Sequence, residues 1–130
     1  MDDNIFDQYA DLYNNTISEN IGYFGKKISY YAEHKSIVIS QNTKLIPRSI
    51  LEYGCGIGRN IGFLTSYFPT ATVEGYDISE KSLMVAKSIH QNIPFLTPHS
   101  IANKSASYNI VLVANVLHHT DPENRVNDLR

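Results

Sequence analysis

Three glycines stand at alternate positions, 54, 56 and 58, directly after a short apolar run that ends in Glu52. Glycine has no Cβ and tolerates positive φ, so this spacing predicts a tight turn whose backbone can touch a ligand. Residues 49–53 read as a strand before the turn, and residues 60–68 read as a helix after it. Because a helix N-terminus favours carboxylate or phosphate groups, the stretch predicts a ligand site at the end of the first strand.

Strand and helix patterns alternate along the rest of the chain. A second strand is expected over 71–76, ending at Asp77, and Ser79 is a good N-cap for the helix that follows. A short third strand is expected near 93–97, and the apolar run within 108–114 predicts a fully buried fourth strand. Asp121 and Pro122 predict the start of a last helix. This alternation predicts an α/β fold with a parallel sheet and right-handed crossovers.

The region before the first strand has a helical pattern. Residues 5–14 and 17–34 carry apolar side chains at helical spacing. The β-branched run within 36–41 fits a strand by propensity and fits equally the end of a buried helix. Pro47 separates this region from the first strand. We expect an N-terminal helical cap segment over 1–47 and the ligand-binding domain over 48–130.

Composition limits the possible partners. With 11 basic and 13 acidic residues the formal net charge is -2, so nucleic acid and membrane surfaces are not expected partners. Cys55 is the single cysteine, which excludes an intrachain disulfide and a cysteine-cluster metal site. No metal site is expected from His118, His119 and Asp121, which lack a ligand spacing. The acidic N-terminus is followed by no signal-like apolar stretch, and we expect a cytoplasmic protein.

The glycine spacing also discriminates between nucleotide-binding motifs. Asp77, at the carboxyl end of the second strand, is placed to accept hydrogen bonds from the two hydroxyls of a ribose. The dinucleotide motif requires a third glycine where Arg59 stands, and a register that starts at Gly56 places Ile61 there. No Gly-Lys-Ser/Thr follows the turn, so a P-loop is excluded as well. The sequence therefore predicts a nucleoside-containing ligand without a pyrophosphate on the loop.

The motif Glu52-x-Gly54-x-Gly56-x-Gly58, Asp77 at the end of the next strand, and the run 108–119 together resemble the class I S-adenosylmethionine-dependent methyltransferases. The small-molecule branch is the most similar, and residues 6–13 resemble its N-terminal segment, which covers the cofactor. The resemblance implies a Rossmann-like, doubly wound parallel sheet. It also implies S-adenosylmethionine as cofactor, S-adenosylhomocysteine as product and a small-molecule methyl acceptor.

The resemblance assigns roles to individual residues. It places the glycine loop against the methionine part of the cofactor, Asp77 on the ribose and Ile78 on the adenine. The family usually has an acid after the third strand that binds the adenine amino group, and His99 or Ser100 stands there instead. The expected cofactor-binding residues are Glu52, Gly54, Cys55, Gly56, Gly58, Asp77, Ile78, Ser100, Ile101, Asn115 and Tyr13.

Four side chains near these motifs need separate interpretation. Glu52 either anchors the loop by accepting backbone N–H bonds or contacts the cofactor's ammonium group, directly or through water. Cys55 is expected to be a small filler rather than a reactive thiol. Arg59 can pair with the cofactor carboxylate or with an acidic neighbour. His119 is the candidate catalytic base if the acceptor must lose a proton, whereas His118 is expected to be structural because adjacent residues point apart.

The end of the sequence departs from the family pattern. The family sheet has seven strands in the order 3-2-1-4-5-7-6, and this sequence supplies patterns for the 3-2-1-4 part. The fourth strand would then be an open edge, which natural proteins avoid. We expect a chain truncated after the fourth strand that carries the cofactor-binding half of a methyltransferase. The alternative is a non-catalytic nucleoside-binding or interaction module whose open edge pairs with a second chain or forms a homo-oligomer.

Overall fold

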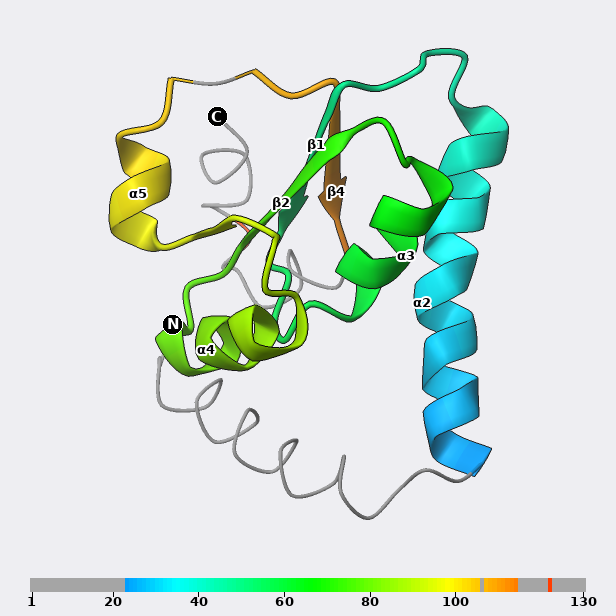
Figure 1. Ribbon diagram of the computed structural model, residues 1–130, viewed down its shortest axis with the longest axis horizontal. Coiled ribbons are helices and arrows are strands. Elements are labelled where there is room, and N and C mark those ends of the chain that lie inside the picture. Colours follow the sequence, from blue (N-terminus) through cyan, green and yellow to red (C-terminus); the bar gives the residue numbers. More distant parts are fainter. Residues whose placement is uncertain (1–22, 106, 115–121, 123–130) are drawn as a thin grey trace.

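The computed structural model describes residues 23–105, 107–114 and 122. Its centre is a four-stranded parallel sheet in the order β3-β2-β1-β4, shown in Figure 1. The strands are β1 (Ser49–Tyr53), β2 (Thr72–Tyr76), β3 (Phe95–Leu96) and β4 (Ile110–Val113). The helices are α2 (Tyr23–Asn42), α3 (Arg59–Tyr67), α4 (Glu80–Ile89) and α5 (Pro98–Ala102). This architecture confirms the predicted α/β, Rossmann-like sheet and its strand order.

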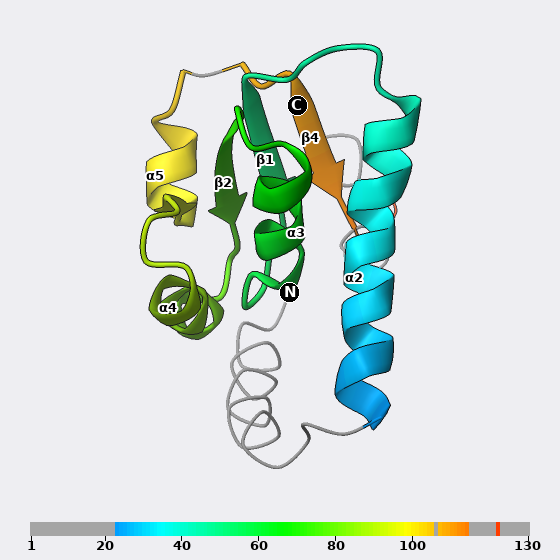
Figure 2. The same cartoon turned by 45° about the vertical axis from the view of Figure 1, so that its right-hand side comes forward.

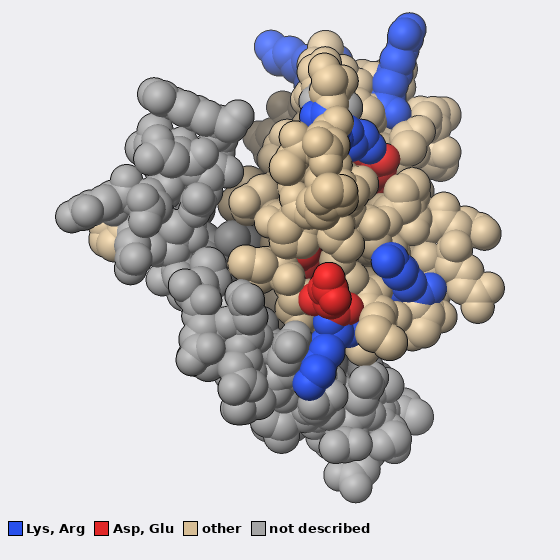
Figure 3. All heavy atoms as spheres, turned by 90° about the vertical axis from the view of Figure 1, so that its left-hand side faces the viewer, with Lys and Arg blue, Asp and Glu red and all other residues tan. Residues whose placement is uncertain are grey.

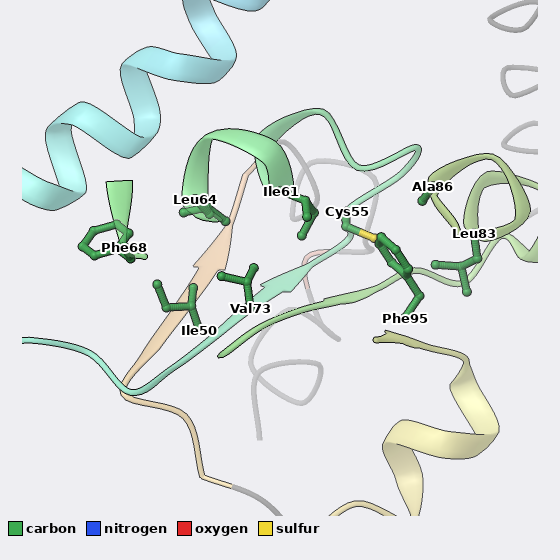
Figure 4. Close-up of a cluster of buried hydrophobic side chains, with 9 residues drawn as sticks. All are labelled: Ile50, Cys55, Ile61, Leu64, Phe68, Val73, Leu83, Ala86 and Phe95. Atoms are coloured by element: carbon green, nitrogen blue, oxygen red, sulfur yellow. The ribbon is translucent and has the colours of Figure 1, made fainter. Parts of the chain in front are cut away.

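A single apolar core joins α3 and α4 to the sheet. Ile50 on β1 and Val73 on β2 are partners in the parallel register and are both buried. Figure 4 shows both of them in one cluster with the α3 and α4 side chains. In α3 the buried residues Ile61 and Leu64 are three positions apart, so one face of the helix lies on the sheet. Burial of each such side chain contributes about 1.5 to 3 kcal/mol to folding.

The long helix α2 runs beside α3, as Figures 1 and 2 show from two directions. It contains the β-branched run at 37–39, so the helical alternative for residues 36–41 is correct. Ala32 and Ser36 are buried, and Ile39 packs against the core; these positions repeat at helical spacing. Contacts along this one face therefore outweigh the strand propensity of the β-branched residues.

The fourth strand is shorter and more exposed than predicted. Ile110 and Leu112 are half-buried toward the core, whereas the side chain of Val111 is 50% exposed. The prediction of a fully buried strand is wrong because β4 pairs only with β1 within the described part of the chain. Its outward side chains are therefore not covered by a described element.

A short helix, α5, was not predicted. It begins after Thr97, whose side chain accepts the N–H of Ser100, while the Ser100 hydroxyl accepts the N–H of Thr97, and the two bonds form a capping box. Pro98 occupies the first turn, where its missing N–H costs no hydrogen bond. The sequence Thr-Pro-x-Ser at 97–100 is a helix-start motif that could have indicated this helix. Five residues are, however, too few for a helical spacing of apolar residues to be recognised.

Replacing Gly75 with alanine is expected to destabilise the fold. A Cβ at this position would lie 2.8 Å from the sulfur of Cys55 and 2.8 Å from the ring of Phe95. Relief of this overlap requires movement in the core, which typically costs about 1 to 3 kcal/mol. Urea denaturation followed by circular dichroism measures the loss.

Gly62 provides the control for this substitution. A Cβ there would make an ordinary contact, 3.4 Å from His90 Cε1, and would replace a glycine inside α3. Gly62→Ala should leave the free energy of unfolding unchanged or raise it by up to about 1 kcal/mol. Equal stability of Gly75→Ala and the wild type would contradict the packing of Cys55 and Phe95 described above.

Candidate functional site

The glycine loop connects the carboxyl end of β1 to the N-terminus of α3. Its three glycines have φ of 79°, 55° and 83° at positions 54, 56 and 58, all in the left-handed region. Gly58 is the N-cap of α3 and has no side chain that could cap the backbone N–H groups of the first turn. A Cβ on Gly56 would meet no heavy atom within 4 Å. Among the described residues, the loop backbone is therefore open at Gly56, where the sequence predicted contact with a ligand.

Two backbone hydrogen bonds hold the loop against the end of β2. The N–H groups of Gly54 and Cys55 both donate to the carbonyl of Tyr76, at 2.7 and 2.8 Å. The N–H of Gly58 donates to the carbonyl of Cys55 at 2.9 Å and closes the turn. These bonds fix the loop beside the next predicted site residue.

That residue, Asp77, joins the loop to the start of α4. Its Oδ2 accepts the N–H of Gly56 at 2.7 Å, and its Oδ1 accepts the N–H of Ser79 at 2.9 Å. Burial raises the pKa of Asp77, and the backbone N–H bonds act in the opposite direction. The backbone of Ile78 also bonds this carboxylate, and a carboxylate offers about four acceptor sites, so Asp77 keeps capacity to accept from a ligand hydroxyl. The structure thus brings Asp77 and the glycine loop together, as predicted.

Glu52 lies at the end of β1 with only 1% of its surface exposed. Its Oε1 accepts a hydrogen bond from Asn60 Nδ2 at 2.5 Å, and its Oε2 is buried without a partner. Burial raises the pKa of Glu52 to about 7, although the Asn60 bond and the charge of Lys35 lower it. The donor is a side chain of α3, so the structure does not show Glu52 anchored through backbone N–H groups of the loop.

The thiol of Cys55 is part of the core. Figure 4 shows its sulfur beside the ring of Phe95. Burial, followed by the charges of Glu52 and Asp77, raises the pKa of the Cys55 thiol. Because a nucleophilic cysteine requires a thiolate, this supports its interpretation as a small filler.

Sequence reasoning missed two residues that support the loop. Asn60 provides the bond to Glu52, and His90, at the end of α4, places Nε2 2.8 Å from the carbonyl oxygen of Gly58. The carbonyl can only accept, so the ring donates through Nε2–H. The ring also fills the space beside Gly58, where a Cβ would lie 3.0 Å from His90 Cδ2. His90 lies 32 positions after Gly58, and no local pattern links them.

Some of the remaining predicted residues lie in the described part of the chain, and the others lie outside it. Ile78 is exposed beside Asp77, and Ile101 is half-buried in α5. The hydroxyl of Ser100 accepts the N–H of Thr97 at 2.7 Å, so it acts in the cap of α5. Burial lowers the pKa of the Arg59 guanidinium. Four predicted residues lie outside the described part of the chain: Tyr13, Asn115, His118 and His119. The helix expected after Asp121 also lies outside it.

Two further features concern other classes of site. The described residues contain no group of three or more His, Cys, Asp and Glu side chains that could hold a metal ion. None of the described helices is both long and apolar enough to cross a membrane. On the face shown in Figure 3, basic side chains stand apart, separated by uncharged and acidic residues.

The fold is a Rossmann-like domain whose glycine loop and Asp77 lie together at the carboxyl ends of β1 and β2. Residues 50–130 match a family model described as a methyltransferase domain. This match covers more than half of the chain, so the protein belongs to this methyltransferase family. No curated protein sequence matches the chain.

Several solved structures with a similar fold are methyltransferases. The plantazolicin methyltransferase BpumL, in complex with a monoazolic desmethylPZN analog and SAH, is 25% identical with a TM-score of 0.60, covering 93% of this chain and 49% of that one. Magnesium protoporphyrin IX methyltransferase (ChlM) from Synechocystis PCC 6803, with bound SAM, is 23% identical with a TM-score of 0.62. The match covers 82% of this chain and 55% of ChlM. CalS10, an amino pentose methyltransferase from Micromonospora echinaspora, is 14% identical with a TM-score of 0.63. The match covers 82% of this chain and 49% of CalS10. The chain therefore spans about half the length of these proteins.

Proposed function

We propose that this chain binds S-adenosylmethionine and carries the cofactor-binding half of a methyltransferase that acts on a small-molecule acceptor. One observation carries the proposal: the 2.7 Å bond between Gly56 N and Asp77 Oδ2 joins the glycine loop to an acid at the end of the next strand. This bond supports a site in which the loop binds the amino-acid end of the cofactor and Asp77 binds its ribose at the same edge of the sheet. The BpumL and ChlM structures, which contain SAH and SAM, support this choice of cofactor.

Each described residue has a distinct part in this proposal. The N–H groups at the start of α3 bind the cofactor carboxylate, since they point along the positive end of the helix dipole. The free Oε2 of Glu52 accepts from the ammonium group, and Asp77 accepts from the ribose hydroxyls. When bound, S-adenosylmethionine supplies a methyl group on a sulfonium, which an acceptor takes by in-line displacement. The chain's contribution is then mainly alignment, and His119 is the proposed base for an acceptor that must lose a proton.

The small-molecule acceptor follows from the sequence resemblance and from two of the similar proteins. ChlM is a magnesium protoporphyrin IX methyltransferase, and CalS10 is an amino pentose methyltransferase. We also place the protein in the cytoplasm, because its single cysteine is kept as a buried thiol.

Calorimetric titration of the 130-residue chain tests the cofactor assignment. S-adenosylhomocysteine should bind, whereas nicotinamide adenine dinucleotide should not, because the loop lacks the third glycine that a pyrophosphate site requires. No heat with either ligand at millimolar concentration, from a chain that circular dichroism shows to be folded, would overturn the proposed function.

Asp77→Ala should weaken S-adenosylhomocysteine binding roughly 10-fold to 100-fold, because hydrogen bonds to a charged group contribute about 1.5 to 3 kcal/mol. Asp77→Asn keeps one acceptor oxygen and should lie between the alanine variant and the wild type. Glu74→Gln is the control, since Glu74 lies on β2, the strand that Asp77 follows, but bonds Lys104 and Tyr108 instead. An Asp77→Ala variant that folds and binds as well as the wild type would show that the ribose lies elsewhere.

A further inference from the structure

Glu52 is an unusual acid because it is buried in the middle of the sheet. It lies on β1, and its strand neighbours in the register are Gly75 and Leu112, neither of which has a polar side chain. Among the described residues, Asn60 donates to one of its oxygens, and the other, Oε2, is buried without a donor. A carboxylate so poorly solvated is costly, and the neutral acid costs less. The unliganded geometry therefore favours the protonated form of Glu52.

The charged groups around Glu52 do not restore the ionised form. Lys35 on α2 favours the carboxylate, whereas Asp77, after β2, opposes it. Cys55, in the loop, stays a neutral thiol because its pKa is raised by burial, and α3 provides the neutral amide of Asn60. The result is a pKa of about 7 for Glu52, so its charge changes near neutral pH.

We propose that Glu52 releases its proton to solvent when the ammonium group of the cofactor binds beside its unpartnered oxygen. This inference rests on the proposed function, which places that ammonium group at the start of the glycine loop. An ammonium ion supplies what Oε2 lacks, namely a hydrogen-bond donor and a positive charge within contact distance. The neutral acid and the ammonium ion become a carboxylate, an ammonium ion paired with it, and one proton in the buffer. Glu52 thus makes cofactor affinity depend on pH.

Proton release is measured by titrating S-adenosylhomocysteine into the 130-residue chain in phosphate and in imidazole buffer at the same pH. These buffers take up a proton with different heats, so the difference in binding heat counts the protons released. We expect about half a proton per ligand at pH 7, because an acid with a pKa of about 7 is half protonated there. Affinity should rise about 10-fold between pH 6 and pH 8, as the ionised fraction of Glu52 increases.

Two controls assign the proton to Glu52 and to the ammonium contact. Glu52→Gln should abolish the dependence on buffer and weaken binding at pH 8 by roughly 10-fold or more. Glu74→Gln, a matched change on β2, should keep the wild-type proton release. The ligand 5′-methylthioadenosine has the adenosine and sulfur but no ammonium group, and it should bind the wild type without releasing a proton. Release with this ligand would assign the proton to another group, such as Asp77, and would overturn the inference.

A measurement without substitution is the 13C chemical shift of the Glu52 side-chain carboxyl. It should titrate near pH 7 in the free protein and stay at the value of a carboxylate from pH 6 to 8 in the complex. If S-adenosylhomocysteine binds with a heat that is independent of buffer, the inference is wrong while the cofactor assignment stands. If the ligand does not bind at all, both are wrong.

Discussion

Glu52→Gln is expected to stabilise the folded protein at pH 8 by roughly 2 kcal/mol, although it weakens cofactor binding. The pKa of Glu52 is about 7 in the folded chain and 4.5 as an isolated group. Between these values the folded state holds more protons than the unfolded state, so the wild type loses stability as pH rises from about 4.5 to 7. This loss amounts to roughly 2 to 3 kcal/mol between pH 5 and pH 8. Glutamine cannot ionise, so the variant does not lose stability in this way as pH rises. Burial of its amide group costs some stability, which makes the net gain smaller than the full loss in the wild type.

Urea denaturation of the wild type and of Glu52→Gln at several pH values from 5 to 8 measures this difference. The curve of the wild type should fall relative to that of the variant as pH rises, and Glu74→Gln should run parallel to the wild type. Parallel curves for Glu52→Gln and the wild type would show that Glu52 is already ionised at pH 5. A residue that lowers stability but is placed to bind a ligand is typical of functional sites.

Gly56→Leu is expected to abolish S-adenosylhomocysteine binding, with a loss of at least about 100-fold in affinity. Gly56 has φ of 55°, and a Cβ added there would meet no heavy atom of the described residues within 4 Å, so the first carbon of a leucine side chain can be added without a clash. The strain of a left-handed leucine costs only about 1 to 2 kcal/mol of stability. The side chain would occupy the position where the cofactor lies against the loop. Binding should therefore fall much more than stability.

Calorimetry gives the affinity of this variant, and urea denaturation gives its free energy of unfolding. Ser66→Leu, which adds leucine to an exposed position of α3, is the control and should bind normally. A Gly56→Leu variant that is folded and binds like the wild type would show that no ligand lies against this part of the loop.

The parts of the site that could be predicted are those set by local chemistry. The left-handed glycines and the cap at Ser79 depend on neighbours in the sequence. The alternation of strands and helices predicted a parallel sheet, and the family resemblance implied its strand order 3-2-1-4. Asp77 was located correctly because the end of a parallel strand lies at the ligand edge of the sheet. Its bond to Gly56 follows from the same arrangement.

The parts that could not be predicted depend on packing between distant segments. The Asn60 bond to Glu52 and the His90 bond to Gly58 require the positions of α3 and α4 on the sheet. The run at 37–39 is helical because α2 packs beside α3, and Val111 is half exposed because no described strand lies beyond β4. Local patterns cannot report such neighbours, so burial of β4 was overestimated from its apolar sequence.

The most direct test of the cofactor assignment is the amide spectrum of the 15N-labelled chain during titration with S-adenosylhomocysteine. The account predicts that the amide signals of Gly54, Gly56 and Gly58 shift strongly, together with those of Asp77 and Ile78. With 5′-methylthioadenosine the shifts at Asp77 and Ile78 should remain, and those of the glycine loop should shrink, because that ligand has no amino-acid end. Saturable binding of S-adenosylhomocysteine that leaves the three glycine signals in place would contradict the account.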